Sequence, residues 1–332
     1  MKANHMEMRR LGGTDIEISP IGLGCMQFAG TANYTRLIIN PIGQEAVASI
    51  VRAALDGGMT WFDTAEMYGN GRSERALAGA LKECGVAPGE VVIASKWRPH
   101  LRTSASITKT IGDRLAHLGG YPLDLHQIHM PTGSLSGIPD QLRAMAGLLR
   151  SGRIRSVGVS NFSARQLELA HRVLASEGVT LAANQVRISL LHRDVERDGV
   201  LATARSLGVT LIAYSPLEGG LLTGRYHENP TLARSAPPAR RFFGRRELSA
   251  AGLARTAPLV EAMREIGQGY GASVSQVALN WLITRYGDTV VAISGASRPE
   301  QATKAAAAMA FRLTEDEVAR LNELSASADA SR

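Results

Sequence analysis

Short apolar runs alternate with amphipathic segments along most of the chain. The runs expected to form buried strands are Ile21–Met26, Met59–Asp63, Val91–Ser95, Leu123–His129, Ile154–Ser160, Leu181–Val186, Val209–Tyr214 and Val290–Ser294. Their first residues are separated by 38, 32, 32, 31, 27 and 28 positions, and the last step is 81. Steps of about 30 residues match the length of one βα unit.

Helical patterns lie between these runs. The clearest are Glu45–Leu55, Ser73–Cys84, Ser104–Leu118 and Ser163–Ala175, the last with Gln166 placed to complete a capping box. Alternating strands and helices favour a parallel sheet covered by helices. We therefore expect an α/β fold, a (β/α)8 TIM barrel, and the alternative is a doubly wound open sheet.

Two additions to the eight units are expected. Met8–Ile18, with its Gly12-Gly13 turn, suits an N-terminal β-hairpin at the bottom of the barrel. The long last step implies an inserted loop between strand 7 and the last helices, which we place at 218–257 as a lid. No break in composition divides the chain, so 8–328 is expected to be one domain and 1–7 an extension or tag remnant. The loop Gly30–Pro41 follows the first strand and is expected to influence substrate choice.

Composition narrows the class of protein. The 332 residues are 45% hydrophobic and 20% charged, a globular balance that excludes disorder. No apolar run approaches the roughly 20 residues of a membrane span. Cys25 and Cys84 are the only cysteines, and the N-terminus lacks a secretory pattern, so a cytoplasmic location is expected. The net charge is +7, and six arginines against two glutamates within 223–247 account for +4 of it.

Polar residues close almost every expected strand. They are Asp63, Lys96 just after its strand, His129, Ser160-Asn161, Gln185, Tyr214-Ser215 and Ser294-Gly295. In barrels of this type the working groups sit at the C-terminal ends of the strands. The pattern therefore predicts one polar ring that forms the functional site.

Asp63, Tyr68, Lys96 and His129 are the chemically informative members of this region. A phenol is a weak acid at neutral pH, and a neighbouring ammonium lowers its pKa. We expect Lys96 to do so beside Tyr68, with Asp63 as the partner of the ammonium and His129 orienting a carbonyl or sharing the proton. A structural ion pair is the alternative for Asp63 and Lys96. No metal site is expected, because His126 and His129 would point to opposite faces of their strand.

Two segments are candidates for phosphate binding. Gly267–Ala272 matches G-x-G-x-x-A but follows a helical segment, Leu259–Ile266, so we reject it as a Rossmann fingerprint. Ile293–Glu300 follows the last strand, where barrels often bind phosphate at a helix N-terminus. There Ser297 is expected to cap the next helix and Arg298 to offer a bidentate contact.

Ordered motifs along nearly the whole chain resemble those of the aldo-keto reductase family, in its bacterial-type form with a short C-terminal tail. They are Gly22–Met26, Asp63–Asn70, Ser95-Lys96, Ile128–Pro131, Gly158–Phe162, Asn184-Gln185, Tyr214–Leu217, Gly220–Gly224 and Gly295–Gln301. Each motif alone is weak, and their common order makes the resemblance strong.

The resemblance implies a catalytic tetrad of Asp63, Tyr68, Lys96 and His129, with NADPH (NADP+) as the hydride donor. The implied cofactor contacts are Gly24, Cys25, Met26, Asp63, Ser160, Asn161, Gln185, Tyr214, Ser215, Pro216, Leu217, Gly219, Leu222, Arg225, Gly295, Ala296, Ser297, Arg298 and Gln301. Within this set the resemblance gives Tyr214 the nicotinamide ring, the segment 215–222 the pyrophosphate, and Ser297 with Arg298 the 2′-phosphate. The expected walls of the substrate pocket are Phe28, Trp97, Met130 and Phe162.

The expected function is NADPH-dependent reduction of aldehydes or ketones to alcohols, with Tyr68 as general acid. One alternative is a cofactor-binding regulatory subunit with vestigial reductase activity, and another is a barrel lyase that uses Lys96 as a Schiff base. The partner is expected to be a small-molecule carbonyl substrate, with no nucleic acid and no membrane. The arginine-rich insertion is expected to cover the phosphate end of the cofactor.

Overall fold

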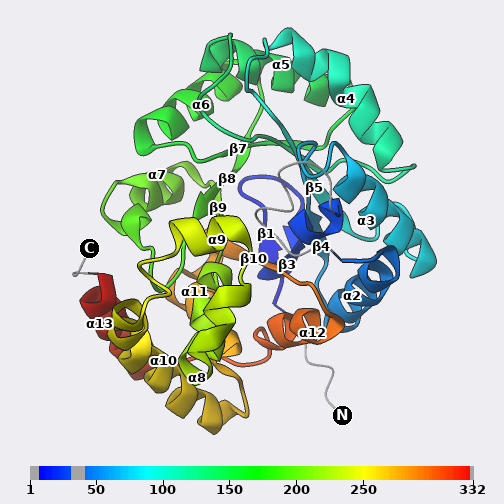
Figure 1. Ribbon diagram of the computed structural model, residues 1–332. Coiled ribbons are helices and arrows are strands. Elements are labelled where there is room, and N and C mark those ends of the chain that lie inside the picture. The colour runs from blue at the N-terminus through cyan, green and yellow to red at the C-terminus, as the bar shows by residue number, and fades with distance from the viewer. Residues whose placement is uncertain (1–6, 31–41, 330–332) are drawn as a thin grey trace.

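The computed structural model describes residues 7–30 and 42–329 of the chain. Eight parallel strands close into a barrel, in the order β10-β3-β4-β5-β6-β7-β8-β9 (Figure 1). The strands are β3 (Ile21–Gly24), β4 (Trp61–Asp63), β5 (Val92–Trp97), β6 (Leu125–Ile128), β7 (Ser156–Ser160), β8 (Leu181–Arg187), β9 (Thr210–Tyr214) and β10 (Val290–Gly295). The closed barrel confirms the expected fold and excludes the open sheet.

Helices surround the barrel (Figure 1). They are α2 (Gln44–Asp56), α3 (Arg72–Glu83), α4 (Ala105–His117), α5 (Ile138–Arg150), α6 (Ala164–Ser176), α7 (Val200–Leu207), α10 (Ala250–Tyr270), α11 (Val274–Arg285), α12 (Pro299–Ala307) and α13 (Glu315–Asp329). The capping box predicted from Ser163 and Gln166 is present at the start of α6. In the described part of the chain, no helix is long and apolar enough to span a membrane.

The N-terminal hairpin closes the bottom of the barrel, as predicted. Its strands are β1 (Arg9–Arg10) and β2 (Glu17–Ile18), which pair antiparallel. The turn between them presses against β8: a Cβ on Gly12 would lie 2.4 Å from the carbonyl oxygen of Ala182. Leu11 is 1% exposed and belongs to the same apolar cluster as Trp61, which lies inside the barrel.

The interior of the barrel is layered. The lower layer is apolar and comprises Trp61, Ala94, Leu125, Ala183, Ile212 and Val291. Side chains alternate along a strand, so the next inward position lies two residues further on. On β4, β5, β6 and β8 these positions are the buried residues Asp63, Lys96, Gln127 and Gln185. A polar layer therefore rests on an apolar one at the C-terminal end of the barrel.

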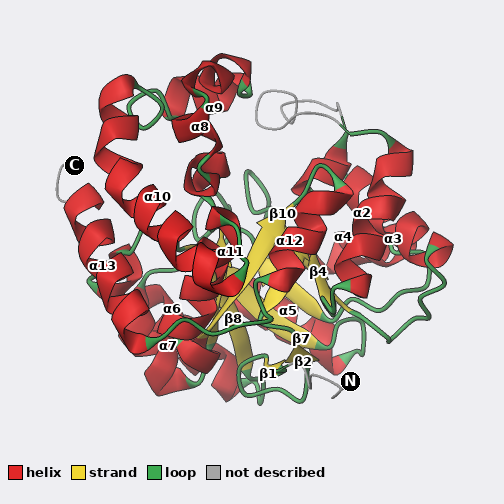
Figure 2. Ribbon diagram, turned by 90° about the horizontal axis from the view of Figure 1, so that it is seen from below, coloured by secondary structure: helices red, strands yellow, loops and turns green. Residues whose placement is uncertain are grey.

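The segment between β9 and α10 contains most of the insertion that was predicted at 218–257, whose last eight residues belong to α10 instead. It contains η3 (Glu218–Thr223), α8 (Arg225–Glu228), η4 (Pro230–Ser235) and α9 (Pro238–Phe243); short turns elsewhere are η1 (Met26–Ala29), η2 (Asp194–Glu196) and η5 (Gly287–Thr289). Figure 2 shows α8 and α9 at the end of the barrel opposite β1 and β2. The rejected fingerprint, Gly267–Ala272, lies at the C-terminal end of α10. Residues 1–6 of the expected extension and 31–41 of the expected substrate loop lie outside the described residues.

Candidate active site

A buried ion pair occupies the polar layer of the barrel. Lys96 and Asp63 are 0% and 1% exposed, and the Lys96 ammonium pairs with Oδ1 of Asp63. The ammonium also donates to the carbonyl oxygen of Thr64 at 2.9 Å. Because a buried charge is costly unless it is paired and hydrogen-bonded, this arrangement fixes both side chains.

The second carboxylate oxygen of Asp63 accepts two amide hydrogen bonds. Nε2 of Gln185 lies 2.9 Å from Oδ2, and Nε2 of Gln127 lies 3.3 Å from it. Gln127 was not among the residues expected at the site. The signal was present, because alternation along β6 places Gln127 on the same face as the inward-pointing Leu125.

Tyr68 lies on the turn between β4 and α3 and faces this ion pair. The Lys96 nitrogen is 5.3 Å from the centroid of the Tyr68 ring. The imidazole of His129 meets the same ring edge-on, with centroids 5.9 Å apart and planes at 80°. The structure therefore brings together the four side chains, Asp63, Tyr68, Lys96 and His129, that the sequence singled out.

The pKa of Tyr68 departs from the expectation. Burial raises the pKa of the phenol, and the Asp63 carboxylate raises it further. The expected lowering of the pKa by Lys96 was wrong, because the ammonium is paired directly with Asp63 and lies 5.3 Å from the centroid of the ring. Tyr68 is consequently protonated throughout the physiological range and is available as a proton donor.

His129 follows β6 directly and is held by its backbone N–H, which donates to the carbonyl oxygen of Trp97 at 3.0 Å. Burial lowers the pKa of the imidazole to about 3, with further contributions from Lys96 and Arg98. The ring is therefore neutral at physiological pH. Such a ring can hydrogen-bond a carbonyl oxygen without adding a positive charge to the site.

Polar side chains from three neighbouring strands meet beside this cluster. The Tyr214 hydroxyl donates to Oδ1 of Asn161 at 3.0 Å, and Nδ2 of Asn161 donates to the Ser160 hydroxyl at 3.0 Å. The Ser160 hydroxyl in turn donates to the backbone carbonyl oxygen of Gln185 at 2.9 Å. Asn161 adopts a φ of 61°, an uncommon conformation for a residue other than glycine. Ser160, Asn161 and Tyr214, three of the expected cofactor contacts, therefore lie together in one chain of hydrogen bonds.

The turn after β9 has an unusual backbone. Positive φ values occur at Ser215, Glu218, Gly219 and Gly220. Glu218 is buried and anchors the turn, since its carboxylate pairs with Arg187 and accepts from the Ser189 hydroxyl at 2.7 Å. The remaining predicted contacts of this segment are Pro216, Leu217 and the buried Leu222.

Arg225 folds back onto the same turn. Its guanidinium donates to the Tyr226 hydroxyl at 2.6 Å and to the carbonyl of Gly219 at 3.3 Å. The guanidinium carbon lies 4.5 Å from the centroid of the Tyr226 ring. A cation is thus placed directly against the segment expected to contact phosphate.

The end of β10 adjoins β3, where Gly295 pairs with Gly24 in register. The N-cap of α12 is Arg298, so the prediction that Ser297 caps this helix was wrong. Instead, the backbone N–H of Ser297 donates to Oε1 of Gln301 at 2.7 Å, and its hydroxyl donates to the same oxygen at 3.1 Å. The exposed Arg298 remains at the N-terminus of α12, where helix N–H groups favour anions. Ala296, between Gly295 and Ser297, is buried.

The expected pocket walls differ in accessibility. Trp97 and Phe162 are each 1% exposed and Phe28 is 4% exposed, so these rings belong to the core. The Trp97 indole donates to the Ser106 hydroxyl of α4 at 3.1 Å. Met130, at 44% exposed, is the one expected wall that presents a large accessible surface.

Comparisons with known proteins agree with this geometry. The family model described as "Aldo/keto reductase family" matches residues 20–326. This chain belongs to the aldo/keto reductase family. It is similar to an uncharacterized oxidoreductase of Mycobacterium tuberculosis, with 37% identity over 86% of this chain and 82% of the relative. It is also 33% identical to the chloroplastic pyridoxal reductase of Arabidopsis thaliana, over 92% of this chain and 83% of that protein.

A solved structure supports the same assignment. A thermostable aldo-keto reductase in complex with the inhibitor epalrestat superposes with a TM-score of 0.75 and 31% identity, covering 96% of this chain and 100% of that one. The protein is therefore an oxidoreductase with the fold of an aldo-keto reductase, and carbonyl reduction is the general chemistry that the family and its reductases support.

Proposed function

We propose that this aldo-keto reductase reduces aldehydes and ketones to alcohols with NADPH, and that Tyr68 is the general acid. The observation that carries the proposal is the protonated phenol of Tyr68 beside a neutral His129 and a buried Lys96–Asp63 pair. Bound NADPH would supply a hydride to the carbonyl carbon. The chain must then protonate the oxygen, which becomes an alkoxide far more basic than a phenolate.

Each side chain has a distinct task in this scheme. The hydroxyl of Tyr68 donates the proton to the substrate oxygen. His129, whose pKa of about 3 keeps it neutral, orients the carbonyl by a hydrogen bond. The Lys96 ammonium stabilises the negative charge that develops on oxygen, and Asp63 holds this ammonium in place through its buried contact.

The residues expected to hold the cofactor divide by chemistry. Ser160, Asn161 and Gln185 would bind the carboxamide, and Tyr214 would stack on the nicotinamide ring. The turn 215–222 with Arg225 would bind the pyrophosphate, and Arg298 would bind the 2′-phosphate. An arginine at a helix N-terminus favours NADPH over NADH, since only NADPH carries that phosphate.

We also propose that the protein is cytoplasmic. Both cysteines, Cys25 and Cys84, are free thiols, in keeping with a reducing compartment.

The decisive experiment compares the wild type with Tyr68→Phe. With a panel of aldehydes and ketones, the wild type oxidises NADPH faster than NADH, and Tyr68→Phe loses about 10²- to 10⁴-fold in kcat. Tyr68→Phe retains its affinity for NADPH, measured by cofactor fluorescence. Full turnover in Tyr68→Phe would remove the proposed acid, and tight cofactor binding without turnover of any carbonyl would favour the regulatory alternative.

Arg298→Ala tests the preference for NADPH. The dissociation constant for NADPH should rise about tenfold, which corresponds to the loss of one charge-assisted contact, whereas that for NADH should stay the same. An equal change for both cofactors would contradict the assignment of the 2′-phosphate to Arg298.

A further inference from the structure

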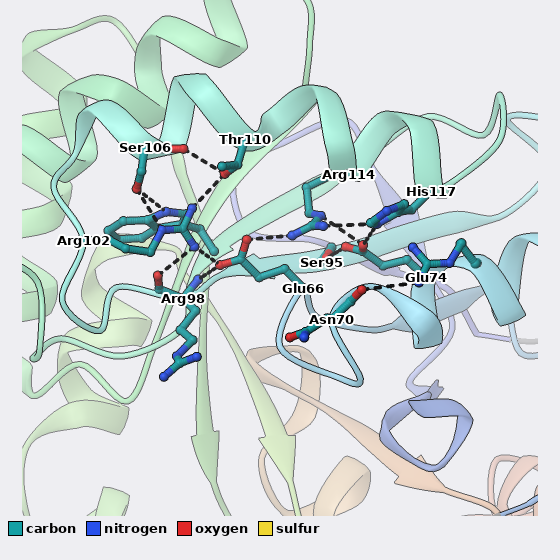
Figure 3. Close-up of polar contacts among 12 residues, drawn as sticks. Glu66, Asn70, Glu74, Ser95, Arg98, Arg102, Ser106, Thr110, Arg114 and His117 are labelled. Carbon is teal, nitrogen blue, oxygen red and sulfur yellow. Dashed lines mark hydrogen bonds and ion pairs between the residues drawn. The ribbon is translucent and has the colours of Figure 1, made fainter. Parts of the chain in front are cut away.

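A buried network of ion pairs lies behind the turn that carries Tyr68. Its centre is Glu66, two residues before Tyr68 and 8% exposed. The Glu66 backbone N–H donates to the carbonyl of Lys96 at 3.3 Å and so extends the pairing of β4 with β5. Its carboxylate accepts from the backbone N–H of Arg98 and pairs with Arg102 and Arg114 (Figure 3).

The arginines are fixed by the inner face of α4. Arg102 donates to the Ser106 hydroxyl at 3.0 Å and to the Thr110 hydroxyl at 2.8 Å. Arg114 donates to Oε2 of Glu66 at 2.6 Å. Ser106, Thr110 and Arg114 are spaced four residues apart, so they lie on one stripe of the helix. Both arginines that pair with Glu66 are therefore held by α4, a helix outside the barrel.

A second carboxylate, which comes six residues after Tyr68 in the sequence, continues the network. Glu74, in the first turn of α3, is 0% exposed and accepts from the Ser95 hydroxyl at 2.6 Å. It pairs with Arg114 at 3.0 Å and with Nδ1 of His117 at 3.0 Å (Figure 3). Arg114 thus bridges the two carboxylates that stand before and after Tyr68 in the sequence.

The attachment points on β5 give the network a link to the chemistry. Glu74 binds the residue before Lys96, namely Ser95, and Glu66 binds the backbone just after it, at Arg98. The two carboxylates therefore tie the segment around Tyr68 to the strand with Lys96 at two places, one before Lys96 and one after it. Buried ion pairs add little net stability, but their directional contacts can select one geometry.

We propose that the network of Glu66, Glu74, Arg102 and Arg114 sets the position of Tyr68 against Lys96, with Glu66 and Arg102 as positioning residues for proton donation. This inference rests on the proposed function for its kinetic readout. None of the four side chains needs to touch the substrate. Their effect is on the placement of the phenol, and displacement of a reacting group by about 1 Å can reduce a rate by about 100-fold.

The test compares Glu66→Gln with a matched control, Asp124→Asn. Asp124 is likewise buried, accepts from a backbone N–H of β5 (Ile93, 2.8 Å) and pairs with an arginine (Arg155, 2.8 Å), but at the opposite end of that strand. Both variants lose stability. Only Glu66→Gln loses about 10- to 100-fold in kcat, while its NADPH dissociation constant stays within about twofold of wild type. Its kinetic isotope effect with deuterated NADPH increases, because the chemical step becomes slower than product release.

A second variant and a second measurement keep the inference testable if Glu66→Gln does not fold. Arg102→Met removes one of the two arginines that pair with Glu66, and the Arg102 side chain is 26% exposed, so the loss of stability is smaller. We expect this variant to lower kcat in the same way as Glu66→Gln. The 13Cζ resonance of Tyr68, assigned among the seven tyrosines with Tyr68→Phe, shifts in Glu66→Gln or Arg102→Met and not in Asp124→Asn.

The outcomes separate the two proposals. Equal kcat values and isotope effects in the Glu66→Gln, Arg102→Met and Asp124→Asn variants would overturn the positioning role and leave the proposed reaction intact. A wild type that reduces no carbonyl would overturn the proposed function. In that case an unmoved Tyr68 resonance in the Glu66→Gln or Arg102→Met variant would still overturn the positioning role, and a shifted one would support it.

Discussion

Removing one charge from the Lys96–Asp63 pair should destabilise the whole barrel. Both side chains are essentially inaccessible to solvent, at 0% and 1% exposed. Asp63→Asn leaves the buried ammonium without an opposite charge, so that only neutral oxygens such as the Thr64 carbonyl can accept from it. Breaking such a pair from one side costs about 3–5 kcal/mol, a large fraction of the roughly 5–15 kcal/mol that stabilise a typical domain.

A double variant distinguishes this cause from simple disruption of packing. Asp63→Asn/Lys96→Met removes both charges and nearly preserves the shapes of the side chains. The oxygen of the new amide can accept from the side-chain amides of Gln185 and Gln127, as the carboxylate does. We therefore expect the double variant to recover most of the lost stability, with a coupling free energy of about 2 kcal/mol or more.

Urea unfolding followed by circular dichroism gives the four free energies of this cycle. Arg320→Met is a useful control, because its pair with Glu265 is about half exposed on both sides, at 50% and 51%, and its loss should cost less than about 1 kcal/mol. The double variant should be folded and inactive, since it lacks the ammonium that we propose to stabilise the alkoxide. If the two single effects simply add, or if Asp63→Asn costs no more than Arg320→Met, the reasoning about the buried charge is refuted.

Three further predictions follow from burial and packing. The pKa values of His126 and His129, about 4 and about 3, lie below their usual 6.5, so the folded state is stabilised above pH 6.5 and loses stability as the pH falls towards 4. Each contributes up to about 1.4 kcal/mol per pH unit in urea titrations, and His126→Gln should remove its share. Gly22→Ala should lower stability by about 1–3 kcal/mol in thermal unfolding, because its Cβ would lie 2.3 Å from the Trp61 ring. Finally, kcat for reduction should not decline up to about pH 9, because the raised pKa of Tyr68 keeps the acid protonated; a loss near pH 8 would contradict this.

The architecture could be predicted from the sequence because one requirement repeats eight times. Each barrel strand must be buried on both faces, so each appears in the sequence as an apolar run. The run does not show at which residues the strand begins and ends. Leu123–His129 was expected as a strand, whereas β6 covers Leu125–Ile128. The ladder ends at Ile128, and His129 is held by a single backbone bond to Trp97. Apolar content therefore locates a strand but does not define where its pairing ends.

The pKa of Tyr68 could not be predicted from the sequence as well as the positions of the site residues could. The sequence placed an ammonium near Tyr68, but the pKa of the phenol depends on how far that charge is already neutralised. Direct contact of Lys96 with Asp63 removes most of its effect at 5.3 Å, and burial then dominates. Similarly, Trp97 is the last residue of β5 and alternates with the inward-facing Lys96, so its ring lies in the core. The ring of Phe162, two residues after β7, is buried as well.

The stripe on α4 shows why the positioning network escaped notice. Ser106, Thr110 and Arg114 recur every four residues, and a polar stripe on a helix normally indicates a face exposed to solvent. In the barrel this stripe faces β5 and the Tyr68 turn instead, and the carboxylates of Glu66 and Glu74 come from another βα unit. A helix that turns a polar stripe inward must find partners for every charge, because an unpaired buried charge would unfold it. Those partners come before and after Tyr68, the proposed proton donor, in the sequence. This combination of burial and position is the reason to propose that the network acts in catalysis as well as in stability.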